Sequence, residues 1–255
     1  MPELVYPPVI LTAKLGFRAL GLHFLERGAD NIPRNGGAVL ASNHVSYLDF
    51  IFVGLAARPS GRLVRFMAKE AVFRHRVTGP LMRGMRHISV DREAGAAAYA
   101  HAVDALRRGE IVGVFPEATI SRSFQLKEFK SGAARMASEA GVPIIPMVTW
   151  GGQRILTKGR PRDLTRGRMI AMTVGEPFPA TGDPQATTDE LRRRMQALLE
   201  QTQRHYPHDP EGVDDRWWLP VHLGGTAPTY DEAEAMDAEE RRTRAAARAA
   251  GTRGS

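Results

Sequence analysis

The sequence of 255 residues contains no cysteine and no long apolar run. Without cysteine, the chain has no disulfide bond, no thiolate metal site and no cysteine nucleophile. Nowhere do about 18 apolar residues follow one another, so the sequence predicts no transmembrane helix. The N-terminus lacks a basic start and a small-residue cleavage site, which argues against a secretory signal.

The overall composition is that of a globular protein, with 43% hydrophobic and 25% charged residues. The length allows a large core and one domain or two. The formal charge of +7, part of which lies in an Arg-rich tail, suits an anionic membrane surface or a phosphorylated substrate. Nucleic acid is not predicted as a partner, because the cations are scattered and no nucleic-acid module is present.

The segment Val9–Leu25 places apolar side chains at spacings of three and four, with Lys14 and Arg18 on its polar side. This pattern predicts an amphipathic helix. Such a helix either lies in the interface of an anionic bilayer or packs on the core of its own domain, and the pattern fits both. We assign residues 1–35 to an N-terminal amphipathic, membrane-associating segment.

Short apolar runs alternate with helical patterns from residue 36 onward. Strands are expected at Ala38–Ser42, Leu63–Ala68, His87–Val90, Ile111–Phe115, Ile144–Val148 and Met169–Val174. Helices are expected at Tyr47–Ala57, Arg76–Met82, Ala94–Arg108, Gly132–Ala140 and Thr188–Gln203. The alternation predicts an α/β fold with a largely parallel central sheet flanked by helices. We assign residues 36–206 to this domain and residues 207–255 to a C-terminal extension, partly a charged helix or disordered.

The segment SNHVSYLD (42–49) places His44 in the loop after the first expected strand and Asp49 in the first turn of the next helix. An imidazole can take a proton from an alcohol, and a carboxylate on its other nitrogen selects the tautomer. The pair is a Ser-His-Asp triad without its serine, so the nucleophile would be a hydroxyl of the substrate. The structural alternative is a capping box formed by Ser46 and Asp49 at the start of the helix.

Three further segments follow expected strands or enclose one: GMRHISVDR (84–92), VGVFPEATIS (112–121) and VPIIPM (142–147). Arg92 can clamp a phosphate with its planar fork, although a surface pair with Asp91 is the alternative. Glu117 can orient a glycerol hydroxyl or a cationic side chain, or serve as a structural carboxylate in the loop. VPIIPM has no acid–base side chain and fits a buried strand or an acyl pocket.

In their order, these four segments resemble the motifs of the glycerolipid acyltransferase superfamily, which contains the 1-acyl-glycerol-3-phosphate acyltransferases. The family's motifs are H-x-x-x-x-D, G-x-x-F-x-x-R, F-P-E-G-T-R-S and V-P-I-x-P, and the resemblance covers roughly residues 36–173. MAKE (67–70) and FKSGA (129–133) are smaller likenesses. The resemblance implies that His44 is the general base and that Asp49 supports it. The residues expected to bind substrate are Lys69, Arg92, Glu117, Thr119, Arg122 and Lys130.

The chain departs from the family at Ala118-Thr119-Ile120, where the family has G-T-R. The arginine credited with binding the substrate phosphate is therefore replaced by Ile120. We expect Arg92 to be the main phosphate anchor, helped by Arg122 or Lys130. The aromatic position of the second motif is also altered.

The resemblance implies transfer of a fatty acyl group from acyl-CoA or acyl-carrier protein to the free hydroxyl of a lysophospholipid. The expected acceptor is 1-acylglycerol-3-phosphate and the expected product is phosphatidic acid. The protein is expected to be a peripheral or monotopic protein at the cytoplasmic face of the membrane. Neither a cofactor nor a metal is expected. Backbone N–H groups near the helix that follows Asn43 are one candidate for the oxyanion donors.

Two alternatives stay open. The first is another lysophospholipid or a glycolipid as acceptor, which the loss of the arginine at position 120 favours. The second is a non-catalytic lipid-binding membrane protein with the same fold. A serine hydrolase is not expected, because the sequence has no G-x-S-x-G motif. The sequence makes no prediction of oligomeric state.

Overall fold

The computed structural model describes residues 4–90, 95–212 and 214–251. The chain divides into two compact units. The first comprises Met1–Ile120 and Glu128–His208, and the second comprises Ser121–Lys127 and Asp209–Ser255. The second unit therefore joins the C-terminal part of the chain to a short segment from its middle.

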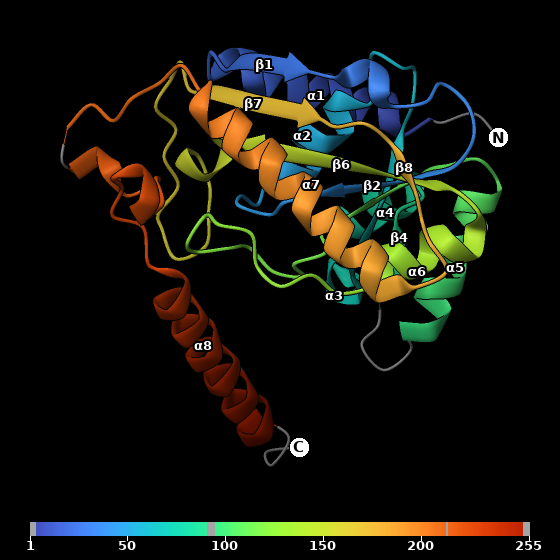
Figure 1. Ribbon diagram of the computed structural model, residues 1–255. Helices are drawn as coiled ribbons and strands as arrows, with labels where there is room; N and C mark the ends of the chain where they lie inside the picture. Colours follow the sequence, from blue (N-terminus) through green and yellow to red (C-terminus); the bar gives the residue numbers. More distant parts are fainter. Residues whose placement is uncertain (1–3, 91–94, 213, 252–255) are drawn as a thin grey trace. The chain divides into compact units, whose positions relative to one another are not determined.

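The first unit is built on an eight-stranded sheet with the order β1-β7-β6-β2-β5-β3-β4, and β8 pairs with β6 (Figure 1). Neighbouring strands are parallel except where β6 meets β7 and β8. This mixed α/β sheet confirms the predicted fold class. The strands are β1 (His23–Arg27), β2 (Ala38–Ser42), β3 (Val64–Lys69), β4 (Ile88–Val90), β5 (Ile111–Val114), β6 (Pro143–Trp150), β7 (Met169–Val174) and β8 (Phe178–Pro179).

Helices cover both faces of the sheet. The helices of this unit are α1 (Tyr6–Ala19), α2 (Asp49–Ala56), α3 (Glu70–Arg74), α4 (Thr78–Gly84), α5 (Gly95–Arg107), α6 (Gly132–Ala140) and α7 (Pro184–Arg204). Helix α6 packs between α5 and α7, and α7 crosses β6 and β7 (Figure 1). On the other face, Ile145 and Met147 of β6 share a core with Phe52 of α2. Because side chains alternate along a strand, Pro146 of β6 points to the opposite face. On that face, Pro146 and Leu198 of α7 both lie next to Gly175.

Strand β2 lies in the middle of the sheet, between β5 and β6, and all five of its residues are buried. Its sequence AVLAS is apolar without alternation, as expected for a strand that is covered on both faces. The rigid position of β2 determines where the loop that follows it, beginning at Asn43, leaves the sheet.

The N-terminal helix is shorter than predicted. Helix α1 ends at Ala19, and Gly21 takes the left-handed conformation (φ +60°) that commonly terminates helices. The residues that follow, His23–Arg27, were expected to be helical at their start but form the edge strand β1, parallel to β7.

One face of α1 packs on the domain. Phe17 is buried and contacts Phe24 and Phe52 through its ring. The other face is exposed, since Leu11 and Leu15 each keep 59% of their surface accessible. Among the described residues, no helix is both long and apolar enough to span a bilayer.

The second unit contains a long charged helix, α8 (Tyr230–Gly251). Its Asp237 is buried and accepts hydrogen bonds from Arg122 at 3.0 Å and from Lys127 at 2.7 Å. Glu240 also pairs with Arg122 at 3.0 Å. These ion pairs join the segment Ser121–Lys127 to α8 within this unit.

Candidate functional site

His44 and Asp49 lie in contact at the carboxyl end of β2. The Nδ1 atom of His44 is 3.0 Å from Oδ2 of Asp49, and the side chain of Asp49 is fully buried while that of His44 is 20% exposed. Because Asp49 accepts from Nδ1–H, this geometry selects the tautomer in which Nε2 carries no proton. None of the described residues forms a hydrogen bond to Nε2. The unprotonated nitrogen is therefore available to accept a proton from a ligand.

The Asp49 carboxylate receives four hydrogen bonds. Besides His44, the backbone N–H groups of Val45 and Ser46 donate to Oδ2, each at 2.7 Å. The hydroxyl of Thr149 donates to Oδ1 at 2.9 Å. The expected capping box is not formed at the helix start, because α2 begins at Asp49 with Leu48 as its N-cap, and no side chain caps it. The bonds from Val45 and Ser46 instead tie Asp49 to the loop that carries His44. Such a network holds the carboxylate in one orientation.

The register of the sheet brings His44 between two distant segments. Ala41 pairs with Val114 of β5, and Ser42 pairs with Met147 of β6. Continuing both pairings past the strand ends sets His44 opposite Glu117 on one side and Thr149 on the other. Carboxyl ends of parallel strands meet at one edge, which is where sites form in such sheets.

Thr149 is tied to the loop by a second set of contacts. Its backbone N–H donates to Oδ1 of Asn43 at 2.7 Å, and the Asn43 amide donates to the Thr149 carbonyl at 3.1 Å. Both residues are buried. Thr149 and Asn43 were missed in the sequence analysis, because VPIIPM was considered without the two residues that follow it.

Glu117 and Phe115 support His44 from the β5 side. The backbone N–H of His44 donates to Oε1 of Glu117 at 2.9 Å, and Glu117 is buried. The ring of Phe115 stacks on the imidazole, with centroids 4.3 Å apart. Glu117 thus holds the backbone of His44, and its contact with a glycerol hydroxyl stays a prediction.

The prediction that backbone N–H groups near the start of α2 form the oxyanion hole is wrong for residues 44–49. The N–H groups of residues 44, 45 and 46 donate to carboxylates, as described above. Those of Tyr47, Leu48 and Asp49 donate to the carbonyl of Leu156, the hydroxyl of Ser46 and the carbonyl of Ser46. A substrate oxyanion would have to compete with these acceptors, so these amides are not a preformed oxyanion hole.

Three other predicted substrate residues lie in the same unit. Lys69 is the exposed last residue of β3, at the edge where the parallel strands end. Thr119 is half-buried in the loop after β5. Lys130 is exposed, and its backbone N–H donates to the carbonyl of Pro116 at 2.9 Å, next to Glu117. The structure brings their backbones to one edge of the sheet, and their roles toward substrate stay predictions.

The two remaining candidates differ in status. Arg122 belongs to the second unit, where Asp237 and Glu240 already neutralise its charge. Arg92 lies outside the described residues, so its role stays a prediction.

The turn after β5, where Ala118-Thr119-Ile120 replaces the family's G-T-R, keeps the left-handed backbone conformation that favours glycine. Ala118, where the family has glycine, takes φ +60°, a conformation that costs a residue with a side chain about 1 kcal/mol. Ile120, at the position of the family's arginine, is buried. The loop after β5 therefore offers an apolar residue at this position.

Comparisons with known proteins agree with this architecture. A family model described as Acyltransferase matches residues 23–150. The 1-acyl-sn-glycerol-3-phosphate acyltransferase of Bacillus subtilis (strain 168) is 27% identical over 181 residues, which are 66% of this chain and 84% of that protein. The enzyme of the same name from Borreliella burgdorferi is 28% identical over 57% of this chain and 58% of its own length.

A solved structure is also similar, that of the 1-acyl-sn-glycerophosphate (LPA) acyltransferase PlsC from Thermotoga maritima. The TM-score is 0.68 at 21% identity, and the match covers 79% of this chain and 81% of that one. At this identity the likeness establishes the shared fold.

Proposed function

Because this chain belongs to the acyltransferase family, we propose that it transfers a fatty acyl group from acyl-CoA or acyl-carrier protein to a lysophospholipid. The proposed acceptor is 1-acylglycerol-3-phosphate and the product is phosphatidic acid, as the names of its relatives suggest. The observation that carries the proposal is the contact between Nδ1 of His44 and the buried carboxylate of Asp49.

In the proposed reaction, Nε2 of His44 takes the proton of the acceptor hydroxyl as its oxygen attacks the thioester carbonyl. Asp49 balances the charge of the imidazolium through Nδ1. The carbon–sulfur bond then breaks, and the imidazolium returns the proton to the departing thiolate. A positioned general base contributes about 10²–10⁴ in rate, so substrate positioning supplies much of the rest.

The proposed acceptor and product are membrane lipids, so we propose that the reaction takes place at a bilayer surface, on its cytoplasmic face. The exposed face of α1 supports this, because Leu11 and Leu15 project beside the exposed cations Lys14 and Arg18. Apolar side chains of such a helix enter the lipid interface while the cations meet anionic headgroups. Tyr47, half exposed between His44 and Asp49 in the chain, adds apolar surface next to the pair.

A second acceptor class is favoured by one observation. Ile120 is buried where the family has an arginine for the substrate phosphate. An acceptor with a head group beyond the phosphate, or a glycolipid, needs less charge at this position. The same catalytic pair would serve it.

The test is turnover with palmitoyl-CoA and a panel of lysolipids. Released CoA can be measured with a thiol reagent without background, because the chain has no cysteine. We expect lysophosphatidic acid to be used best. His44→Ala and Asp49→Asn should lower kcat by about 10²–10⁴ while circular dichroism stays unchanged. The exposed His23→Ala is the control and should keep full activity.

Three outcomes contradict the proposal in different ways. Preference for a neutral or head-group-bearing lysolipid would favour the second acceptor class. Vesicle binding without CoA release from any acceptor would favour a non-catalytic lipid-binding protein. Near wild-type turnover of a folded His44→Ala variant would refute the assignment of the base.

A further inference from the structure

Helices α3 and α4 form a short hairpin between β3 and the edge strand β4, with residues 75–77 as its turn. Helix α3 begins directly after Lys69, the last residue of β3, so the hairpin starts at the edge of the sheet where His44 lies. Three large apolar side chains of the hairpin are exposed, Val72 at 38%, Val77 at 66% and Leu81 at 38%. Single exposed apolar residues are common, but several on one short element indicate a contact surface.

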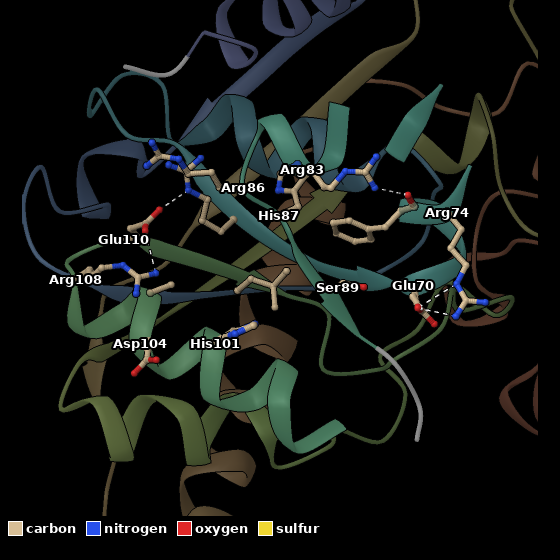
Figure 2. Close-up of a pocket in the computed structure, with 14 residues that line it drawn as sticks. Glu70, Arg74, Arg83, Arg86, His87, Ser89, His101, Asp104, Arg108 and Glu110 are labelled. Carbon is tan, nitrogen blue, oxygen red and sulfur yellow. Dashed lines mark hydrogen bonds and ion pairs between the residues drawn. The ribbon is translucent and has the colours of Figure 1, made fainter. Parts of the chain in front are cut away.

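Hydrogen bonds hold the turn of the hairpin, so the exposure of Val77 belongs to a defined conformation. The N–H groups of Val77 and Thr78 donate to Nδ1 of His75 at 3.3 and 3.4 Å. Arg83 of α4 donates to the carbonyl of Phe73 in α3 at 2.7 Å, which ties the two helices together (Figure 2). The side chain of Val77 takes part in none of these bonds, so it can be changed without disturbing the turn.

The hairpin is strongly cationic. Residues 69–84 contain four cations and one carboxylate, a net charge of +3, whereas the whole chain carries +7. Arg74 pairs with that carboxylate, Glu70, at 2.8 Å (Figure 2). Arg76 is exposed and forms no ion pair with any residue that the structure describes. Cations around an exposed apolar side chain suit an anionic bilayer, because the cations meet the headgroups while the apolar group leaves water.

The hairpin adjoins other elements that expose apolar side chains. Gly84, the last residue of α4, packs against the residue before α1, since a Cβ atom at Gly84 would lie 2.5 Å from a methyl carbon of Val5. Leu4, next to Val5, is 77% exposed. Phe50 of α2 is 40% exposed, and its ring centroid lies 6.1 Å from that of Phe66 in β3, the strand that leads into the hairpin. Exposed apolar side chains therefore occur on α1, at the start of α2 and on the hairpin.

We propose that the α3–α4 hairpin is a second membrane contact besides α1, with Val77 inserted among the headgroups of an anionic bilayer and with Arg74 and Arg76 against the lipid phosphates. The inference rests on the proposed function, which requires work at a bilayer. A fluid bilayer can receive apolar side chains that are spread over several elements, whereas a protein partner would have to match each of them. Two separate contacts fix the orientation of the domain. Because the hairpin starts at the edge that carries His44, this orientation keeps that edge near the lipid.

The first test uses the absence of cysteine, because a single introduced thiol in the full chain can carry a polarity-sensitive dye. The labelled Val77→Cys protein is mixed with vesicles of phosphatidylglycerol and phosphatidylcholine. We expect its emission to shift to the blue and to be quenched by lipids with brominated acyl chains, as for a side chain that enters the bilayer. The labelled Ala197→Cys protein is the control and should show neither effect. Ala197 is exposed on α7, which covers the face of the sheet opposite to α2.

The second test measures sedimentation of the full chain with the same vesicles. Val77→Glu should weaken binding about tenfold, because an apolar side chain is lost from the bilayer and a negative charge is added. Arg76→Gln should weaken binding about fivefold, as expected for one cation near an anionic surface, and should have no effect with pure phosphatidylcholine. Arg34→Gln removes an exposed arginine that precedes β2, at the opposite edge of the sheet, and should change binding by less than about twofold. Circular dichroism should be the same for all three variants, since each side chain is exposed.

Three results would overturn the proposal. An unshifted emission of labelled Val77→Cys on vesicles that carry the protein would show that the turn stays in water. Equal responses of the two labelled proteins would indicate adsorption without a defined orientation. A shift on addition of an acidic carrier protein, but not of vesicles, would assign the hairpin to a protein partner.

The same measurements separate this proposal from the proposed function. If the turn of the hairpin enters the bilayer but no lysolipid is acylated, the membrane contact is supported and the proposed function fails. If lysolipids are acylated while the turn stays in water, the proposed function is supported and the membrane contact fails.

Discussion

The hydroxyl of Thr149 provides a direct test of how the pair His44–Asp49, which we propose to be catalytic, is held in place. Thr149→Val keeps the size of the side chain and the backbone bond to Asn43, but removes the donor to Oδ1 of Asp49 at 2.9 Å. Within the described part of the chain this is the sole donor to Oδ1, and both side chains are fully buried. A hydrogen bond to a charged group is worth about 1.5–3 kcal/mol, so we expect a loss of that size in the free energy of unfolding.

Activity should fall as well, because the carboxylate that orients His44 loses one of its four bonds. The two backbone donors on Oδ2 remain, so we expect kcat to fall about tenfold, equivalent to ~1.4 kcal/mol, with KM for both substrates within about twofold. Thr149→Ser retains the hydroxyl and should recover most of kcat. These values come from CoA release at saturating substrate, alongside thermal unfolding.

The matched control is Thr202→Val. Thr202 is buried in α7 and donates to the hydroxyl of Thr173 at 2.8 Å, so its loss costs stability away from the pair. It should lower the melting temperature without changing kcat. If Thr149→Val lowers stability like the control and leaves kcat unchanged, Thr149 is structural and does not position Asp49.

Three other predictions follow from the sequence and the structure. Arg92→Ala should raise KM for lysophosphatidic acid far more than KM for acyl-CoA. Arg92→Lys should restore it only in part, because lysine lacks the planar fork of arginine. Equal effects on both substrates would contradict this prediction. The double variant Leu11→Glu/Leu15→Glu should sediment less with anionic vesicles than the wild type does. The control variant Leu164→Glu, at a leucine of similar exposure, should sediment like the wild type. High salt should further weaken the binding to vesicles. Burial lowers the pKa of His87 from 6.5 to about 4 in the folded chain. The free energy of unfolding should therefore fall by up to about 3 kcal/mol as the pH drops from 6.5 to 4, because the unfolded chain takes up a proton that the folded chain does not. Urea unfolding of His87→Asn should show a flatter pH dependence.

Local patterns were enough to predict several parts of this protein. The bounds of β2, α6 and β7 agree with the sequence pattern, because each is a short apolar or amphipathic run with a clear end. The approach of His44 to Asp49 was also foreseeable, since a loop and the first helical turn bring residues five apart together. The order of the motifs was sufficient to indicate the family that the comparisons established.

Contacts between distant parts of the chain could not be derived in this way. Thr149 reaches Asp49 across 100 positions, through the register of β6 on β2, and no local pattern contains that register. The edge strand β1 likewise depends on β7, so its residues were taken in part for helix. Hydrogen bonds that complete the site come from strand pairing, which depends on the whole sheet.

The sequence by itself determined the alternation of strands and helices, the pairing of His44 with Asp49 and the replacement of the family's arginine by Ile120. Each of these features depends only on residues close together in the chain. The tertiary structure alone decided how the chemistry is supported. It showed that the N–H groups of residues 44–49 are already occupied, and that Arg122 is bound to carboxylates of α8. It also gathered five arginines along β4. Such sites depend on which distant groups burial and strand pairing bring within a few ångströms, and the chain order does not contain that information.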